Sequence, residues 1–535
     1  MFIRVKRSVH DSTTYEYLQI VRSYRDGTKV RQAVVATLGR REALIASGQL
    51  DGLIRSLAKF SERLRVVEVA RTNGLAAHTA RAWGPALVFG RLWERQGLPG
   101  LLRTLAQDRQ FAFDVERVAF ALALQRLTAP GSDLQGSAWV GTVEAPGFSD
   151  LALQHFYRTV GFLGQVREDL EARLWEADRD LFHQALNAVF IDTTSVYVYR
   201  DTETTYRKRG YSRDRRGDLP QFVVCVVVNE AGWPLAWDLF PGNTADPTAF
   251  VAMVKRLRAR WPIRRAVVVA DRGMIGKETI RLLVEDAERP FDYVLGCRLR
   301  RDAEVRQAVL THLGAYERVD EGLEVQEVRV GDRRYVVCRN PVEAERDAAQ
   351  RAALVERLTT TLAEHGPKTL IKNRGYARFV RVKKDSVEIN REAIEADAVL
   401  DGLFILRTST DLPPAEVART YKGLWRVERA FREEKSTLEA RPIFHHGDDT
   451  SIGHLVASFL ALRLEMDLQH RLDERGVEVS WPDLMRDLGQ VQAVEVELDG
   501  ERYRLRTDLA GSASAAFAAA GVRPPSAVTP LGPIP

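Results

Sequence analysis

The spacing of apolar and polar residues changes several times along the chain, and each change marks a different predicted architecture. Residues 1–40 alternate on either side of "RDGT", which predicts a β-hairpin. Residues 41–185 follow a mostly helical period that glycine and proline interrupt. From residue 186 onward, valine-rich runs predict a strand, two further strands, and then a strand–helix–strand unit. This order predicts a mixed sheet covered by helices, which is an α/β fold.

The second half of the chain leaves this core pattern and then returns to it. Short β-like runs, a helix over 341–365 and a basic stretch follow, and we interpret this part as an inserted module. A core-like strand begins at residue 401, a single long helix is predicted over 412–435, and a hairpin over 494–507. The predicted domains are 1–40, the hairpin region; 41–185, mainly helical; 186–298 and 398–475, the two halves of the core; 299–397, the insertion; and 476–535, a C-terminal region whose Pro- and Ala-rich tail is predicted to be disordered.

The composition limits the class of protein without naming it. A chain of 535 residues is too long for one core, so several domains are expected. The 78 basic and 73 acidic residues give a formal net charge of +5, which is weak evidence for a nucleic-acid partner. Cys225, Cys297 and Cys338 stand alone in strand-like runs, as buried free thiols do in a reducing compartment. The start lacks the apolar region of a signal peptide, and the longest apolar run is too short to cross a bilayer, so a cytosolic protein is predicted.

Local charge is more informative than the total. Basic residues gather in three stretches, 206–216, 254–265 and 372–384. Such residues bind phosphates and give affinity without reading sequence. An amphipathic helix with a solvated face is the alternative for 254–265, because Val254 and Leu257 are apolar. For 372–384 the alternative is a sheet edge guarded by charge.

Three acidic residues stand where the apolar pattern predicts burial. Asp192 lies inside the first core strand, Asp271 ends the run "AVVVAD", and Glu428 lies on the apolar arc of the 412–435 helix. Each carboxylate alone has an ordinary interpretation, either solvated, capping a backbone amide, or paired with a buried arginine. Trp425 and Phe431 on the same helix are predicted to be core anchors.

Taken together, the three carboxylates indicate a metal site. Sheets of this class bind ligands at the carboxyl ends of their strands, and grouped carboxylates repel one another unless cations compensate them. Hard oxygen ligands suit Mg²⁺ or Mn²⁺. Two such ions, roughly 3.5–4 Å apart, stabilise the attacking and leaving oxygens of a phosphoryl transfer. The combination therefore predicts metal-dependent chemistry on phosphodiesters.

The helix around Glu428 resembles the corresponding helix of the DDE transposases of bacterial insertion sequences, in the branch with a Y-R-E-K signature. Tyr421, Glu428 and Lys435 have the spacing of that signature, and Leu424 stands at the position of its arginine. The segments "GYSRDRRGDLPQ", "PGNTADPTAF" and "ADRGM" resemble those that connect and carry the family's aspartates. The resemblance covers about 186–295 and 398–470, and the start of the chain and "RPIFHH" resemble one subgroup.

The resemblance implies a ribonuclease H-like catalytic core in which Asp192, Asp271 and Glu428 bind two Mg²⁺ or Mn²⁺ ions. It also implies that 299–397 is the mostly β insertion of the family and that 41–185 binds the DNA ends. With Leu424 at the arginine position, Arg426 or Arg432 is the candidate for that charge. The implied DNA-contacting residues are Tyr421, Arg426, Arg432, Lys435, Arg213 and Arg272.

The function expected from this resemblance is DNA transposition. The protein is expected to bind terminal inverted repeats, to pair two ends as a homodimer in a synaptic complex, to cut them, and to join the 3′-hydroxyl ends to target DNA. No membrane partner is expected, and the protein is placed in the bacterial cytoplasm on the nucleoid. Two alternatives stay open: a metal-dependent nuclease on the same fold that does not integrate, and a DNA-binding relic without catalysis, which Leu424 leaves possible.

Overall fold

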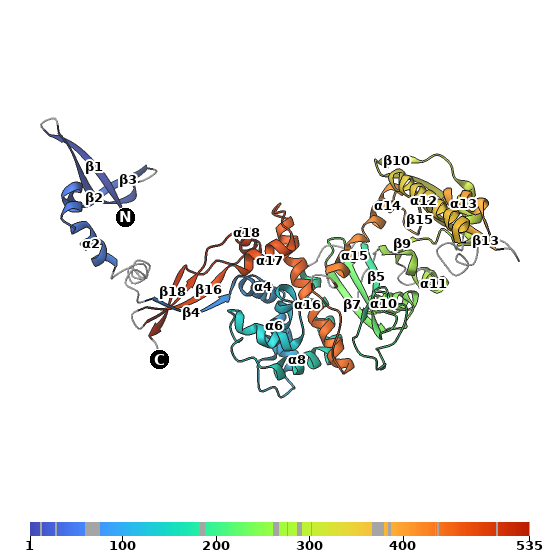
Figure 1. Ribbon diagram of the computed structural model, residues 1–535, viewed down its shortest axis with the longest axis horizontal. Coiled ribbons are helices and arrows are strands. Elements are labelled where there is room, and N and C mark those ends of the chain that lie inside the picture. The colour runs from blue at the N-terminus through green and yellow to red at the C-terminus, as the bar shows by residue number, and fades with distance from the viewer. Residues whose placement is uncertain are drawn as a thin grey trace. The chain divides into compact units, whose positions relative to one another are not determined.

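The computed structural model divides the chain into two compact units, and each is described by itself (Figure 1). The first unit contains Met1–Gly84, Arg486–Ser514 and Arg523–Pro535, and the second contains Pro85–Met485 and Ala515–Val522. The structure describes the chain apart from residues 11–12, 27–28, 59–74, 182–187, 261–266, 275, 286–290, 301, 366–378, 383–386, 434, 436–437, 499–500 and 534–535.

The first unit begins with an antiparallel sheet of order β1–β2–β3, formed by Phe2–His10, Thr13–Asp26 and Lys29–Arg40. The pairing of β2 with β3 confirms the hairpin predicted around "RDGT", and β1 is an additional strand. Helices α1 (Arg41–Ala46) and α2 (Gln49–Ala58) follow.

A second sheet of this unit joins the two ends of the chain, in the order β18–β17–β16–β4. Its strands are Val528–Pro533, Glu501–Arg506, Gln492–Leu498 and Leu75–Ala82. The predicted hairpin is confirmed as β16–β17, but the prediction of a disordered tail was wrong, since β18 pairs with β17. Proline is tolerated in β18 because this strand lies at the sheet edge. The helical interpretation of 41–185 also misses β4, whose pairing with β16 overrides the helix propensity of its alanines.

The second unit is built on one mixed sheet of nine strands, in the order β10–β11–β12–β15–β9–β8–β5–β6–β7. Strands β5, β8 and β9 are parallel neighbours, and the remaining pairs are antiparallel. This arrangement confirms the mixed α/β sheet predicted from residue 186 onward. The strand bounds are β5 Ala188–Tyr197, β6 Gln221–Asn229, β7 Pro234–Pro241, β8 Val267–Ala270, β9 Asp292–Gly296, β10 Glu317–Asp320, β11 Leu323–Val330, β12 Arg333–Arg339 and β15 Leu403–Thr408.

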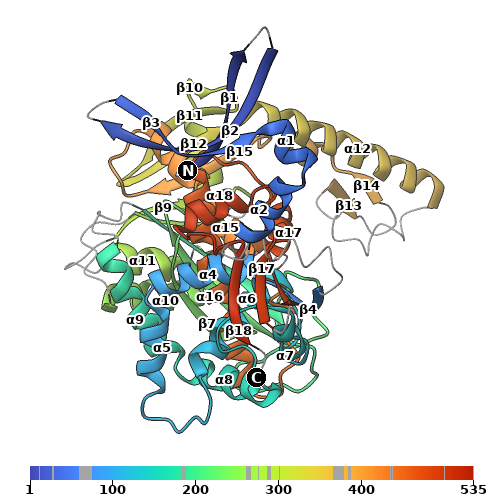
Figure 2. The same ribbon diagram turned by 90° about the vertical axis from the view of Figure 1, so that its left-hand side faces the viewer.

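The segment interpreted as an insertion continues this sheet, because β12 pairs with β15 and carries β11 and β10 beyond it. The helix predicted over 341–365 is confirmed as α12 (Pro341–His365). Figure 2 shows this long helix, near β13 (Val380–Val382) and β14 (Val387–Ile389). Leu358 on α12 and Phe379 beside β13 form the centre of a small apolar cluster that includes α13 (Arg391–Ala398).

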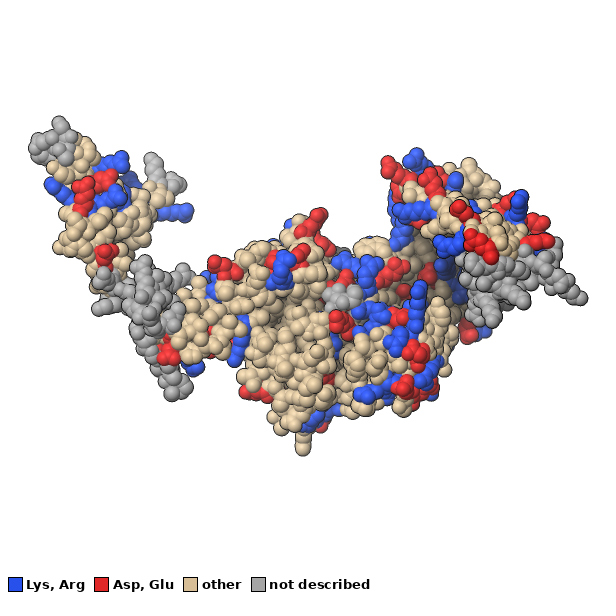
Figure 3. All heavy atoms as spheres, viewed as in Figure 1, with Lys and Arg blue, Asp and Glu red and all other residues tan. Residues whose placement is uncertain are grey.

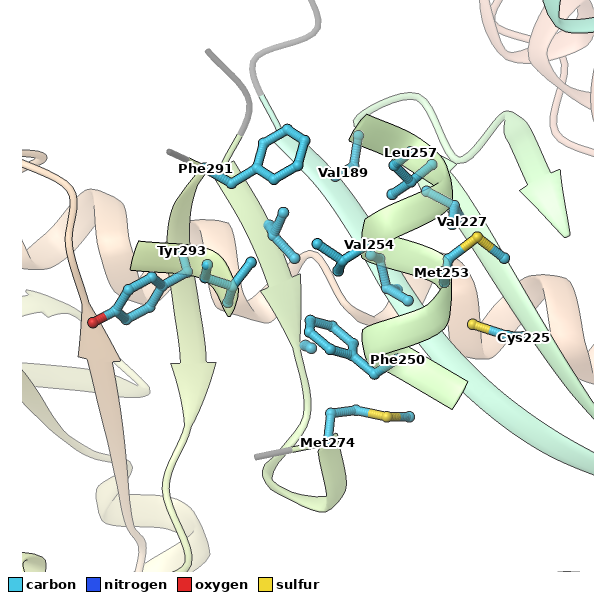
Figure 4. Packing of buried hydrophobic residues seen from close by; sticks show 14 of the residues in the cluster. Val189, Cys225, Val227, Phe250, Met253, Val254, Leu257, Met274, Phe291 and Tyr293 are labelled. Atoms are coloured by element: carbon cyan, nitrogen blue, oxygen red, sulfur yellow. The ribbon is translucent and has the colours of Figure 1, made fainter. Parts of the chain in front are cut away.

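The main core lies between α10 (Asp246–Arg260) and the central strands (Figure 4). Phe250, Met253, Val254 and Leu257 of α10 point toward the sheet, and α11 (Lys277–Glu285) adds Leu283. This supports the amphipathic-helix interpretation of 254–265 as far as the structure describes that stretch. Most of 372–384 lies outside the described residues. All three cysteines are buried free thiols, as predicted.

Helix α16 (Asp448–Asp473) is buried on all sides along most of its length and connects the sheet to the N-terminal helices of this unit. Gly453 lies so close to the carbonyl of Val160 on α8 that a larger residue would collide with it. On the other side, Arg463 forms a bidentate ion pair with Asp178, with both distances 2.8 Å. The N-terminal helices are α4 Gly84–Arg95, α5 Leu98–Ala106, α6 Val115–Thr128, α7 Asp133–Trp139, α8 Leu153–Gln165 and α9 Arg167–Leu181; α17 Trp481–Gly489 and α18 Ala513–Ala520 lie near the C-terminus.

The single helix predicted over 412–435 was wrong. The structure has two helices, α14 (Pro414–Lys422) and α15 (Trp425–Arg432), with Gly423 and Leu424 between them. A side chain at Gly423 would lie 2.7 Å from the ring of Phe190 on β5, so only glycine allows this close approach. Backbone bonds of the i→i+3 type run through the break, for example from the amide of Leu424 to the carbonyl of Tyr421.

Among the described residues, the structure contains no helix with the length and apolar character needed to span a membrane.

Candidate active site

Two of the predicted acidic residues lie side by side on the central sheet. Strands β5 and β8 are parallel, and Ile191 pairs with Ala270. Asp192 and Asp271 are the next residue on each strand, at the carboxyl edge of β8. Asp192 is half-buried, whereas Asp271 is exposed. The sheet register therefore brings together two carboxylates that are far apart in sequence.

The charge on Asp192 is poorly compensated. Burial raises the pKa of this carboxyl to about 7, although Arg213 and the Thr193 amide favour the charged form. The negative charges of Asp271 and Asp246 add to the elevation of the pKa. One hydrogen bond holds the side chain, from the amide of Thr193 to Oδ1 at 2.7 Å. The site thus presents negative charge that a bound cation would stabilise.

Asp246, at the first position of α10, is a part of the site that the sequence analysis did not identify. Its Oδ1 accepts a hydrogen bond from the hydroxyl of Thr193 at 2.7 Å, and its Oδ2 pairs with Arg213 at 3.0 Å. Arg213 also donates to the Thr193 hydroxyl at 2.9 Å. The segment "PGNTADPTAF" marked this region, but no periodic signal singles out the aspartate within it.

Tyr421 reaches the second aspartate from α14. Its hydroxyl donates to Oδ1 of Asp271 at 3.0 Å. Burial, together with the charge of Asp271, raises the pKa of the Tyr421 hydroxyl, so it stays a donor at neutral pH. Gly296 on β9 leaves room for this hydroxyl, because a side chain there would overlap it. Tyr421 therefore orients a carboxylate, and the contact with DNA implied by the sequence resemblance stays a prediction.

Glu428 lies on the exposed side of α15. The apolar-arc prediction assumed a continuous helix, and the break at Gly423 changes which residues share a face. Helix α15 still lies against β5, where Arg426 covers the ring of Phe190 at 5.6 Å. The prediction that Trp425 is a core anchor was wrong, since it is 51% exposed, whereas Phe431 is buried as predicted.

The other predicted DNA-contacting residues fall into two groups. Arg272 and Arg432 are exposed near the strand end and on α15. Lys435 instead donates to Asp214 at 3.2 Å, in the segment after β5 that also carries Arg213. Arg441 forms a second ion pair with Asp214. Figure 3 shows Lys and Arg side chains, with acidic residues among them, on the face over β5, β9 and α15.

The carboxylates fit a hard divalent cation in part. Asp192 and Asp271 supply oxygen ligands of the right chemistry, and the raised pKa of Asp192 marks the missing positive charge. Among the described residues, no three His, Cys, Asp or Glu side chains are grouped closely enough to hold a metal ion. The structure thus brings together two of the three predicted ligands and leaves Glu428 on the neighbouring helix.

Comparison with known protein families identifies the family of this chain. The family described as "IS1634 family transposase, N-terminal domain" matches residues 3–72, and that described as "Transposase DDE domain" matches residues 183–464. The second match spans more than half of the chain and includes both central aspartates and α15. The chain belongs to the DDE transposase family. No curated protein gives a significant match to it.

Family membership confirms the predicted fold class and function. The mixed sheet with flanking helices is the ribonuclease H-like core of a DDE transposase, and the protein acts in DNA transposition as a nuclease and transesterase. Transposases of this family generally use divalent metal ions and have DNA as their partner.

Proposed function

We propose that this transposase cuts DNA at the ends of its element, and joins those ends to target DNA, at a centre formed by Asp192, Asp271 and Glu428. The register of β5 and β8, which puts the two aspartates on adjacent parallel strands, is the observation that carries the proposal. The pKa of about 7 for Asp192 supports it, because a carboxylate held in this way gains most from a bound cation.

Asp192 and Asp271 would hold Mg²⁺, or Mn²⁺ in its place, and Glu428 would complete a two-ion centre. Bound ions of this kind polarise an attacking water or 3′-hydroxyl and stabilise the leaving oxygen. The protein orients the ligands: the Thr193 amide holds Asp192, and the Tyr421 hydroxyl holds Asp271. Free rotation of either carboxylate would weaken metal binding.

Basic residues around the centre would bind the DNA backbone. Arg272 and Arg432 are exposed and suited to phosphate contacts, and Arg426 covers the ring of Phe190 on β5. Arg213 and Lys435 are held by Asp246 and Asp214 respectively, so a phosphate would compete with these carboxylates for them. Such contacts position DNA without reading its sequence.

The finer assignments follow the same proposal. We assign the chain to the Y-R-E-K branch on the spacing of Tyr421, Glu428 and Lys435. The DNA partners would be the terminal inverted repeats and target DNA, bound by a homodimer on the nucleoid. Residues 41–185 would take part in end binding, and 299–397 would act as the insertion domain of the family.

End cleavage by three matched variants tests the site. Asp192→Asn, Asp271→Asn and Glu428→Gln remove one charge each with little change in shape, and Asp108→Asn does the same at an exposed position remote in sequence from all three. With Mg²⁺ and labelled element ends, we expect each of the first three to lose about 10²-fold or more in cleavage rate and the control to keep wild-type rate. Full activity in any one of the three would show that the assignment is wrong.

Strand transfer separates this proposal from a nuclease that does not integrate. Pre-cut ends with a free 3′-hydroxyl should be joined to a supercoiled target by the wild type, and not by Asp192→Asn. Cleavage without joining would favour the nuclease. Binding without either reaction would favour the non-catalytic relic that Leu424 leaves open.

A further inference from the structure

One end of the N-terminal sheet is a two-stranded ribbon. Strand β1 pairs with β2 only as far as Phe2 and Val21, whereas β2 and β3 continue together to Asp26 and Lys29. Residues 22–26 and 29–33 therefore project beyond β1; we call this part the basic ribbon. Figure 2 shows the β2–β3 end separate from the β1–β2 end of the same sheet.

The charge of this ribbon differs sharply from that of the whole chain. Residues 22–26 and 29–33 contain four Lys and Arg and one acidic residue, while the full sequence is nearly balanced at 78 to 73. Arg22 and Arg25 are exposed, and neither forms an ion pair with a residue whose side chain the structure describes, which leaves out Asp26. Tyr24 is 44% exposed and stands opposite Arg31 in the strand register.

Arg7 on β1 and Arg41 at the start of α1 are neutralised, by contrast, by one acidic residue. Arg7 pairs with Glu16 at 3.0 Å, and Arg41 pairs with the other oxygen of Glu16 at 2.6 Å. Both ion pairs lie where β1 and α1 meet β2. Exposed arginines without such an ion pair thus lie on the ribbon, at Arg22 and Arg25.

The dimensions of the ribbon fit DNA. Five residues per strand extend over about 17 Å, and the two strands lie about 4.8 Å apart. The major groove of B-DNA, about 12 Å wide, accepts a two-stranded ribbon, and the flanking phosphates then lie beside its basic side chains. Arg22 and Arg25 are three residues apart on β2, so their side chains point to opposite faces of the ribbon. Each can then reach the phosphates of a different DNA strand.

We propose that the basic ribbon is a DNA-binding element of this transposase and that it enters the major groove, with Arg22 and Arg25 on the phosphates of the two strands. This deepens the proposed function, since it adds a DNA contact outside the catalytic sheet and outside the helical region assigned to end binding. A second copy of the chain is the competing occupant, because Ile3 and Val5 of the same sheet are exposed.

Two double variants of the full-length protein test the ribbon. Arg22→Gln/Arg25→Gln and Arg7→Gln/Arg41→Gln remove the same charge from the same N-terminal region, from the ribbon and from the Glu16 ion pairs respectively. Binding to a fluorescein-labelled duplex is measured by anisotropy in EDTA, from 50 to 300 mM NaCl. Each phosphate contact contributes about 0.9 to the slope of log affinity against log salt. We expect the slope to fall by about 2 for the ribbon variant and by less than 0.5 for its partner.

Equal slopes for the two double variants would overturn the proposal. Netropsin, which occupies the minor groove, should leave the difference between them intact; loss of the difference in netropsin would refute the major-groove assignment. Sedimentation of the DNA-free proteins tests whether the ribbon binds a second copy of the chain. A ribbon variant that loses self-association and keeps its salt slope would mean that the ribbon binds another protomer.

The readout separates this proposal from the catalytic one. Binding in EDTA needs no reaction, so the salt slopes are measured independently of cleavage. If the wild type fails to cleave element ends while the ribbon variants still differ, the catalytic assignment fails alone. If cleavage follows the triad and the two ribbon slopes agree, the ribbon assignment fails alone.

Discussion

The poorly compensated charge of Asp192 leads to a prediction about stability that does not depend on catalysis. The pKa of Asp192 is about 7 in the folded protein, against 3.8 for the unperturbed side chain. The folded state therefore favours the neutral carboxyl. The stability that this carboxyl contributes is fully present below pH 3.8 and is lost as the pH rises through about 7. Asparagine stays neutral throughout, so Asp192→Asn should escape this loss.

The size of the effect follows from the two pKa values. Each pKa unit corresponds to about 1.4 kcal/mol. Between pH 5 and pH 8, the free energy of unfolding of metal-free Asp192→Asn, relative to that of the wild type, should therefore rise by about 3 kcal/mol. Urea unfolding in EDTA at several pH values measures this, and because the slope m grows with protein size, the gain corresponds to about 1 M or less in midpoint. Asp108→Asn, at an exposed position, is the control for the substitution itself. An Asp192→Asn curve parallel to the wild type between pH 5 and pH 8 would refute the reasoning.

Magnesium provides the second arm of this experiment. A cation that binds the folded site stabilises it by RT ln(1 + [Mg²⁺]/Kd), which is about 1.4 kcal/mol at ten times Kd. We expect Mg²⁺ at pH 8 to stabilise the wild type and to reduce the advantage of Asp192→Asn. Equal stabilisation of both proteins would mean that the ion binds elsewhere.

Three further substitutions test other contacts. Tyr421→Phe removes the hydrogen bond to Asp271 and should slow end cleavage about tenfold, which corresponds to about 1.4 kcal/mol of activation free energy. DNA affinity in EDTA should stay unchanged. An unchanged cleavage rate would contradict the orienting role of Tyr421. Asp178→Ala leaves Arg463 buried and unpaired and should destabilise the protein by about 3–5 kcal/mol in urea unfolding, and a loss below 1 would contradict this. Gly423→Ala introduces an atom against the β5 ring and should cost about 1–3 kcal/mol by the same assay, whereas a neutral result would show that the break is not tightly packed.

The features predicted correctly from the sequence are those that short stretches encode. The α12 bounds follow from a continuous helical period between a proline and a basic segment, and the β2–β3 and β16–β17 hairpins from turn residues between alternating runs. The errors concern contacts between distant residues. Strand β4 exists because β16 pairs with it, and the break after α14 exists because Phe190 lies beneath Gly423. Neither partner can be identified from the local pattern.

The site divides in the same way. Asp192 and Asp271 could be selected because apolar strand runs mark where each carboxylate falls, and the parallel register then aligns them. Asp246 could not, because its role depends on Thr193 and Arg213, which reach it only in the folded sheet. The pairing of Lys435 with Asp214 was unpredictable for the same reason.

The break between α14 and α15 changes what the seven-residue spacing means. On an unbroken helix, Tyr421 and Glu428 would drift by about 20° and share one face. In the structure, Tyr421 turns inward to the carboxylate of Asp271, whereas Glu428, beyond Gly423, faces outward. The two aspartates are fixed by strand pairing, whereas Glu428 lies on a two-turn helix that packs on β5 and β6. A short helix after a glycine can shift at a lower energetic cost than paired strands, so in the proposed centre Glu428 would be the ligand whose position is most easily adjusted when metal and DNA bind. Gly423 would then act through the placement of Glu428 as well as through packing.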